Sequence, residues 1–291
     1  LEASDFEQLG TVHAVVFLFK WRQEDYTQEA IASTGGELDF SESIFFAKQT
    51  VNNACATQAI INALLNSSTV SSIGPTLTDF QGFAGALPAD LRGDCIGNNE
   101  VIRTTHNSFS MPDPFVSEEK RSKDDDSDDV FHFVSFLPIN GKLYELDGLK
   151  PAPVCIGTIA EGQAWYEVLI DHLQGRIARF AGNSIKFNLM AMTANRLEAQ
   201  KRELAEVEAK IASASESDEA LEQQKASLSA AIADEQAARE KWKTENKRRR
   251  HNYVPFAMKL LALLASSGDL EECYEAAETT MRARQDAIIA E

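Results

Sequence analysis

The chain has 291 residues, with 28 basic and 45 acidic side chains and a formal net charge of −17. At ~150 residues per domain, this length predicts one large domain or two ordinary ones, which can bury a core without disulfides or a structural metal. A pI of about 4.8 argues against binding to nucleic acid or to anionic membranes, because both need a basic face. The longest apolar runs reach only about a third of a ~20-residue membrane span.

The cysteine pattern bears on the compartment. The four cysteines are far apart, with no C-x-x-C pair and no Cys/His group of zinc-site spacing. Residues 1–5 do not resemble a signal peptide. Unpaired thiols without an export signal favour a reducing compartment inside the cell, and we expect the cytoplasm and the nucleus. The absent initiator Met predicts that a segment upstream is missing from this chain.

Charge divides the chain into three blocks. Residues 1–194 carry 26 acids and 13 bases, residues 195–250 carry 12 of each, and residues 251–291 carry 7 and 3. The middle block is the only one without Gly, Pro or Cys. We therefore expect a mixed α and β domain followed by a separate helical region.

The first block opens with a strand and a helix. Residues 13–21 are rich in β-branched and aromatic side chains, which favour a buried strand. Residues 54–65 contain good helix formers and follow Asn52 and Asn53, and Asn is among the best helix N-cap residues. Residues 107–129 are polar, with two prolines and a run of acids, and predict a long loop. That loop is either a solvated insertion or a lid over a functional site.

A hairpin is predicted around Asn140-Gly141, because this dipeptide separates strand-like runs at 130–139 and 142–146. A two-residue turn pairs positions whose numbers add up to 281. His132 and Asp147 then project from the same face as diagonal neighbours, with Cβ atoms ~7 Å apart or less. That distance is within reach of a hydrogen bond between their side chains. A further strand is predicted at residues 185–192.

Residues 195–250 predict two helices packed as an antiparallel hairpin, because apolar residues recur at multiples of seven in two tracts separated by a polar break at 213–218. The tracts contain Leu197, Leu204 and Ile211, then Leu221, Leu228 and Trp242. With ~3 heptads per arm, plain solvated helices are the alternative. An apolar helix at 253–264 and a stop-and-restart signal at 266–269 predict two more helices.

Cys55 is the most informative residue for function. It lies in the first turn of a predicted helix, where unsatisfied N–H groups and the helix dipole stabilise a thiolate. Taken alone, an inert buried Cys is the commoner situation inside cells.

A nucleophilic thiolate needs a general base and an orienting group for that base, which His132 and Asp147 would provide. An exposed surface pair is the alternative for these two residues. The Gln49 side-chain amide and the Cys55 backbone N–H could then stabilise an oxyanion, which completes the roles needed for cysteine-protease chemistry.

These motifs resemble the ubiquitin C-terminal hydrolases, a family of papain-like deubiquitinating cysteine proteases. The resemblance rests on Q-T-V-N-N-A-C-A-T-Q at 49–58, H-N-S-F at 106–109 and F-H-F-V-S-F-L-P-I-N-G-K-L-Y-E-L-D-G at 131–148. The end of the family's catalytic domain is similar to K-F-N-L-M-A at 186–191. The C-terminal extension of its proteasome-associated member is similar to T-E-N-K-R-R-R-H-N-Y-V-P-F at 244–256.

The resemblance implies an α+β fold. A papain-like catalytic domain over residues 1–193 would have a central antiparallel sheet flanked by helices, with an active-site crossover loop at about 107–130. An all-helical extension would follow over 194–291. Within it, 194–250 would form a coiled-coil-like hairpin and 251–291 docking helices.

The resemblance also implies a site and a reaction. Cys55 would be the nucleophile, His132 the general base and proton donor, Asp147 the residue that orients His132, and Gln49 part of the oxyanion hole. The enzyme would cleave the bond after the C-terminal glycine of ubiquitin. Neither a metal nor an organic cofactor is implied.

The implied partners are ubiquitin, whose Arg-containing tail would complement the acidic domain, and the proteasome regulatory particle, bound through an adaptor or ubiquitin-receptor subunit. A chromatin-remodelling complex is a second implied assembly. Family members also carry an N-terminal strand and helix upstream of the stretch matching residues 6–21. We expect that segment to be absent here, which leaves open whether this chain is fully active.

Two other functions fit the same residues. The helical region could make the chain an assembly scaffold with a vestigial or autoinhibited enzyme domain. Alternatively, the chain could be a different papain-like acyl transferase or peptidase. Turnover of a ubiquitin substrate beside unrelated peptides separates these possibilities.

Overall fold

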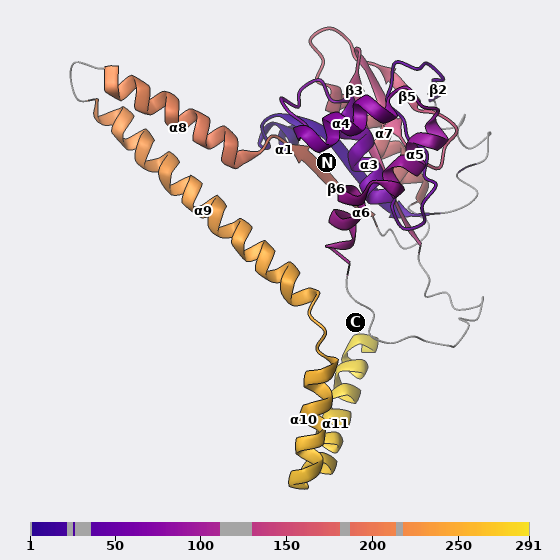
Figure 1. The fold of residues 1–291 in the computed structure, drawn as a ribbon, viewed down its shortest axis with the longest axis vertical. Helices are drawn as coiled ribbons and strands as arrows, with labels where there is room; N and C mark the ends of the chain where they lie inside the picture. Colours follow the sequence, from indigo (N-terminus) through magenta and orange to yellow (C-terminus); the bar gives the residue numbers. More distant parts are fainter. Residues whose placement is uncertain are drawn as a thin grey trace. The chain divides into compact units, whose positions relative to one another are not determined.

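The computed structural model describes residues 2–21, 26, 36–110, 130–180, 187–213 and 218–290 (Figure 1). Contacts group them into two compact units. The larger unit contains the described residues up to Ser108 and from residue 130 to Glu240, and the smaller one contains Phe109, Ser110 and the described residues from Lys241 onward. The division of the sequence into a catalytic domain over 1–193 and an extension over 194–291 stays a prediction.

A six-stranded sheet forms the centre of the larger unit, in the order β2-β5-β4-β3-β1-β6, and every described pairing is antiparallel. The strands are β1 (Val12–Lys20), β2 (Glu37–Leu38), β3 (Phe131–Ile139), β4 (Lys142–Leu146), β5 (Val154–Thr158) and β6 (Phe187–Thr193). Together with the helices that cover it, this sheet confirms the predicted α+β class with a central antiparallel sheet.

The β3–β4 hairpin has the predicted register. Ile139 pairs with Lys142 and Ser135 pairs with Leu146, as a two-residue turn requires. Asn140 and Gly141 have φ values of 50° and 75°. Such left-handed backbone at both turn positions is characteristic of the tight turn that matches the twist of antiparallel strands.

Helices cover both faces of the sheet (Figure 1). On one face α3 (Cys55–Asn66) contacts β1, β3 and β4, and on the other α7 (Trp165–Phe180) contacts β3 and β4 and packs with α1 (Ala3–Glu7). Three further helices pack beside α3: α4 (Gly74–Ala84), α5 (Ala89–Asn98) and α6 (Glu100–Asn107).

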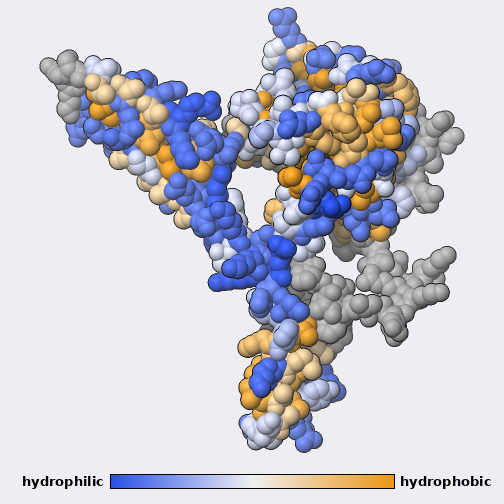
Figure 2. Space-filling view, viewed as in Figure 1, coloured by the Kyte–Doolittle hydropathy of each residue, from blue (hydrophilic) through white to orange (hydrophobic). Residues whose placement is uncertain are grey.

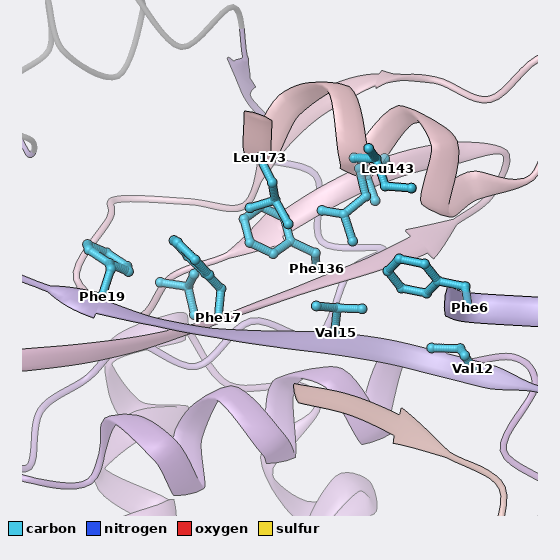
Figure 3. Packing of buried hydrophobic residues seen from close by; sticks show 11 residues of the cluster. Phe6, Val12, Val15, Phe17, Phe19, Phe136, Leu143 and Leu173 are labelled. Atoms are coloured by element: carbon cyan, nitrogen blue, oxygen red, sulfur yellow. The ribbon is translucent and has the colours of Figure 1, made fainter. Parts of the chain in front are cut away.

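Alternation along β1 builds a core on each side of the sheet. Val15, Phe17 and Phe19 point toward α7, where they pack with Phe136 and Leu173 (Figure 3). Ala14 belongs to the other cluster, between the sheet and α3. Both faces of β1 are buried, which explains why its sequence is a nearly continuous apolar run.

The helices α8 (Arg196–Ser213) and α9 (Glu219–Arg249) lie antiparallel. Glu208 pairs with Lys225 at 3.2 Å, whereas Asn195, before α8, accepts a hydrogen bond from Arg239 much later in α9. Half-buried residues in α9 alternate at spacings of four and three: Leu221, Lys225, Leu228, Ile232, Glu235 and Arg239. This spacing is typical of a helix that packs along a partner helix. Trp242 is 62% exposed and does not continue that stripe, in contrast to the heptad assignment.

The smaller unit contains α10 (Val254–Ser267) and α11 (Leu270–Ala290), which contact each other. Gly268 ends α10 with φ 85°, as the stop-and-restart signal predicts. Large apolar side chains stay exposed on this pair, and Figure 2 shows them as hydrophobic patches among polar residues. They include Phe256, Met258, Leu260, Leu261, Leu263, Tyr274 and Met281.

Three details of the sequence-based assignment differ from the structure or lie partly outside the described residues. The loop predicted from residue 107 begins later, because Asn107 is the last residue of α6, and residues 111–129 lie outside the described residues. The strand predicted from residue 185 is described only from Phe187 onward. The start of α3 also differs from the prediction, as described below.

Candidate active site

Cys55 is the first residue of α3, so the predicted position in the first helical turn is confirmed. The predicted cap is wrong: the N-cap is Ala54, with no side-chain hydrogen bond. Asn53 instead adopts left-handed backbone with φ 62°, which Asn tolerates better than most residues. Asn53 therefore turns the chain into the helix and does not cap it. The first N–H groups of α3 are left without a capping side chain beside the thiol.

The thiol of Cys55 is half-buried. Burial by itself would raise the pKa of Cys55, because it disfavours the charged form. Hydrogen bonds with the His132 side chain and with the backbone of Phe133 and Ala56 outweigh burial, and the pKa of Cys55 is lowered. The site therefore stabilises a thiolate, which is the nucleophilic form of cysteine.

His132 lies between the thiol and a carboxylate. It projects from β3, and its Nε2 atom is 2.7 Å from Oδ1 of Asp147, which follows β4. Both residues are buried, with exposed fractions of 3% and 0%, so the alternative of an exposed surface pair is wrong. The Leu149 backbone N–H also donates to Asp147 Oδ1, at 3.0 Å. The hydrogen bond anticipated from the hairpin register is thus present.

The pKa of His132 is set by opposing effects. Burial lowers it, but the hydrogen bonds to Asp147 and Cys55 and the negative charges of these groups raise the pKa of His132 to about 9. An imidazolium is therefore favoured beside a thiol of lowered pKa. This pairing is the charge arrangement that a thiol nucleophile and its acid–base partner need.

Gln49 is placed next to the catalytic candidates by the backbone of the segment that follows Asp147. Its N–H donates to the carbonyl oxygen of Gly148 at 2.8 Å. A Cβ atom on residue 148 would lie 3.0 Å from the Gln49 nitrogen and 3.1 Å from its Cβ, so only glycine fits there without displacement. The Oε1 atom of the Gln49 side chain is buried and has no hydrogen-bond partner in the described part of the chain.

A row of amide side chains on α3, buried at Gln58 and Asn62 and half-buried at Asn66, fixes the segment that leads to Gln49. Asn62 accepts a hydrogen bond from the Ala47 N–H at 2.9 Å and donates to the Ala47 carbonyl at 3.2 Å. Gln58 also donates to that carbonyl, and Asn66 bonds both backbone groups of Phe45. These side chains are spaced four apart, so they share one face of the helix. One helix thus positions both Cys55 and the approach to Gln49.

A second layer of charge lies beneath Asp147. Glu145, fully buried on β4, pairs with Arg176 of α7 and with Lys150, each at 2.9 Å. Burial would raise the pKa of Glu145, but these two cations lower it well below its ordinary value. The carboxylate therefore stays ionised in the core beside the site.

Several contributing residues were not found from the sequence. Gly148, Asn62 and the Glu145–Arg176 pair act through long-range contacts that no local pattern reveals. His106, in a motif quoted for the family, bonds the Thr57 hydroxyl of α3 at 2.8 Å and so connects the end of α6 to the helix of Cys55.

Within the described residues, no group of three or more His, Cys, Asp or Glu side chains is arranged to hold a metal ion. Nor do the helices of the described ranges include one with the length and apolar character needed to cross a bilayer.

Comparison with known proteins decides the family. Residues 1–178 match the family described as ubiquitin carboxyl-terminal hydrolase, family 1, and residues 226–270 match a second ubiquitin carboxyl-terminal hydrolase region. The chain belongs to the ubiquitin carboxyl-terminal hydrolase family. It is therefore a cysteine-type deubiquitinating hydrolase, as predicted.

Relatives of this hydrolase extend over nearly the whole chain. Ubiquitin carboxyl-terminal hydrolase ubh-4 of Caenorhabditis elegans is 41% identical over 94% of this chain and 82% of its own length. Isozyme L5 of Dictyostelium discoideum is 34% identical over 98% of this chain and 88% of its own. Both alignments span the catalytic region and the helical region.

A solved structure gives the same result for the fold of this hydrolase. The crystal structure of Trichinella spiralis UCH37 bound to ubiquitin vinyl methyl ester is 33% identical, with a TM-score of 0.62, and the match covers 83% of this chain and 87% of that one. The ubiquitin C-terminal hydrolase fold with a helical C-terminal region is thereby confirmed.

Proposed function

We propose that this hydrolase cleaves the bond after the C-terminal glycine of ubiquitin, with Cys55 as nucleophile, His132 as general base and acid, Asp147 as the residue that orients His132, and Gln49 as an oxyanion donor. The observation that carries the proposal is the contiguous hydrogen-bonded series from Cys55 through His132 to Asp147. The ubiquitin ester bound to the Trichinella relative supports the choice of substrate.

The reaction proceeds in two steps. The Cys55 sulfur forms a bond to the glycine carbonyl carbon, and His132 transfers a proton to the leaving amine as the C–N bond breaks. The resulting thioester is then hydrolysed by water, whose proton passes to His132 while the Cys55 thiolate leaves. The Cys55 N–H and the Gln49 side-chain amide stabilise the negative oxygen in both steps.

Hydrolysis of a fluorogenic ubiquitin C-terminal conjugate tests this proposal. We expect wild-type turnover, and turnover reduced by at least ~10³-fold for Cys55→Ala, as the loss of the nucleophile in a triad requires. Cys95→Ala is the matched control, because Cys95 is also a half-buried free thiol in the larger unit. Equal rates for ubiquitin and for unrelated peptides of the same leaving group would favour a different papain-like peptidase.

A second part of the proposal concerns assembly. We infer that α10 and α11 dock the chain on an adaptor subunit of the proteasome regulatory particle, with a chromatin-remodelling complex as a second assembly in the nucleus. The observation in favour is the concentration of exposed apolar side chains on these helices, such as Phe256 at 67% and Leu263 at 56% exposed. Cytoplasm and nucleus are the compartments that this assignment requires.

Binding of the full chain to purified proteasome regulatory particle tests the docking. Phe256→Ser with Leu263→Ser is expected to abolish binding, whereas Phe40→Ser, on the larger unit and 71% exposed, is expected to leave it intact. If neither variant nor wild type binds, the docking proposal is wrong. A wild type that binds but shows no turnover, free or bound, would favour the scaffold alternative.

A further inference from the structure

Two buried polar atoms next to the His132–Asp147 pair have no hydrogen-bond partner within the described part of the chain: the Tyr26 hydroxyl oxygen and Oδ2 of Asp147. Asp147 is fully buried, and its other oxygen, Oδ1, already accepts from His132 and from the Leu149 N–H. A buried carboxylate oxygen without a donor is costly, and so is a buried hydroxyl without an acceptor.

Ring contacts place Tyr26 against the site. Its ring lies edge-on to the His132 ring, with centroids 6.1 Å apart and planes at 74°, and its other neighbour is Trp21, at 6.1 Å. Burial and then the charge of Asp147 raise the pKa of the Tyr26 hydroxyl well above its ordinary value. The hydroxyl therefore keeps its proton and is available as a donor at every pH at which the enzyme works.

We propose that Tyr26 is a positioning residue for the proposed reaction: its hydroxyl donates a hydrogen bond to Asp147 Oδ2 and holds the carboxylate in line with His132. Asp147 then has a donor on each oxygen, and rotation about its side chain would break both contacts. The inference rests on the proposed function, because orienting Asp147 matters only if His132 acts as the acid–base partner of Cys55.

The other charged groups around the pair do not take over this role. Glu145 from β4 is engaged by Arg176 of α7 and by Lys150. Arg176 acts on Asp147 and on Tyr26 by its charge, without a hydrogen bond to either in the described ranges. His132 bonds the opposite oxygen, Oδ1. Tyr26 is thus a neutral donor beside the pair, with its ring against His132 and its hydroxyl under the influence of the Asp147 charge.

Tyr26→Phe tests the proposal, because it removes one oxygen atom and keeps the ring between Trp21 and His132. We expect kcat for a fluorogenic ubiquitin conjugate to fall about 10-fold, the rate equivalent of one hydrogen bond to a charged group, with KM unchanged. The basic limb of the pH profile is expected to move to lower pH, because the pKa of His132 near 9 depends on Asp147. Tyr144→Phe is the matched control, since its hydroxyl donates to Asp39 at 2.7 Å elsewhere in the same unit.

Two measurements separate positioning from general stabilisation. In an Asp147→Ala background, Tyr26→Phe should have no further effect on kcat, and a persistent loss would overturn the proposal. NMR titration of the His132 imidazole needs no substrate and should show a lower pKa in Tyr26→Phe but not in Tyr144→Phe. An unchanged or higher His132 pKa contradicts the inference even if ubiquitin turnover is normal, whereas absent turnover in wild type contradicts the proposed function alone.

Discussion

At Cys55 and His132, burial opposes the charges that catalysis needs, and local hydrogen bonds overcome it. Burial disfavours both thiolate and imidazolium, yet the two groups and Asp147 support one another's charges across short contacts. The proposed reactive state is the thiolate beside an imidazolium.

This state predicts a bell-shaped dependence of kcat/KM on pH. Activity should rise as pH passes the lowered pKa of Cys55 and fall as pH passes about 9, where His132 loses its proton. The measurement is kcat/KM for a ubiquitin conjugate between about pH 5 and about pH 10. A basic limb near the ordinary histidine pKa, ~6.5, would show that Asp147 does not support the imidazolium.

Gly148 offers a second prediction at this scale. Gly148→Ala places a Cβ 3.0 Å from the Gln49 nitrogen, so Gln49 must move by a few tenths of an ångström. We expect kcat to fall about 10-fold, less than the ~10²-fold that a full 1 Å misplacement can cost. Gly82→Ala in α4, where an added Cβ meets no atom within 4 Å, is the control for stability and activity. Equal activity of the two variants would show that the position of Gln49 does not affect catalysis, which contradicts its proposed role as an oxyanion donor.

Sequence reasoning reached the residues whose roles depend on local pattern. The Asn140-Gly141 turn fixed the register that brings His132 toward Asp147, and the helix start pointed to Cys55. It misassigned Asn53, because a capping Asn and a left-handed Asn look the same in a sequence. Tyr26 and Gly148 were beyond its reach, since their partners lie far along the chain.

Among the elements, α3 contributes most to the candidate active site. Its first residue is the candidate nucleophile, and its amide row of Gln58, Asn62 and Asn66 bonds the segment that ends at Gln49. These amides bond the backbone N–H and C=O groups of Phe45 and Ala47, which would otherwise be buried without partners.

Asn62→Ala tests this function of α3. It leaves the Ala47 N–H without its partner and removes one of the two amide donors to the Ala47 carbonyl, so we expect a loss of about 1–3 kcal/mol in the free energy of unfolding. Ile60 lies on the same helix and is 42% exposed, so Ile60→Ala should change the free energy of unfolding by no more than about 0.5 kcal/mol. Chemical denaturation of both variants gives the comparison. A similar small loss in both would mean that the amide row is not structural.

Long-range pairing limits what can be predicted about elements. The bounds of β4, Lys142–Leu146, were predicted correctly, because only a two-residue turn separates β4 from its partner strand β3. By contrast, β2 contains two residues and pairs with β5 more than a hundred positions away, and neither strand was predicted. Helices α1 and α4 to α7 were also not predicted from the sequence.

For the molecule as a whole, the excess of acid lies in the block that carries the site. Residues 1–194 hold 26 acids against 13 bases, whereas 195–250 are balanced. A field of one sign raises the association rate of an oppositely charged substrate segment and is screened by salt.

This charge predicts a salt effect on substrate capture. We expect kcat/KM for a ubiquitin conjugate to fall about threefold or more between ~0.05 and ~0.5 M NaCl, where the screening length shrinks to a few ångströms. Alkylation of Cys55 by a neutral reagent such as iodoacetamide is the control and should change little. If kcat/KM did not depend on salt, the acidic charge of the domain would not contribute to ubiquitin capture.

In the proposed reaction, Cys55 is the thiol that reacts with the C-terminus of ubiquitin. The most direct measurement is reaction of the full chain with ubiquitin vinyl methyl ester, followed by peptide mapping of the adduct. We expect a single adduct, on Cys55, that is lost in Cys55→Ala and forms more slowly in His132→Ala. No adduct, or an adduct on Cys95, Cys155 or Cys273, would contradict it.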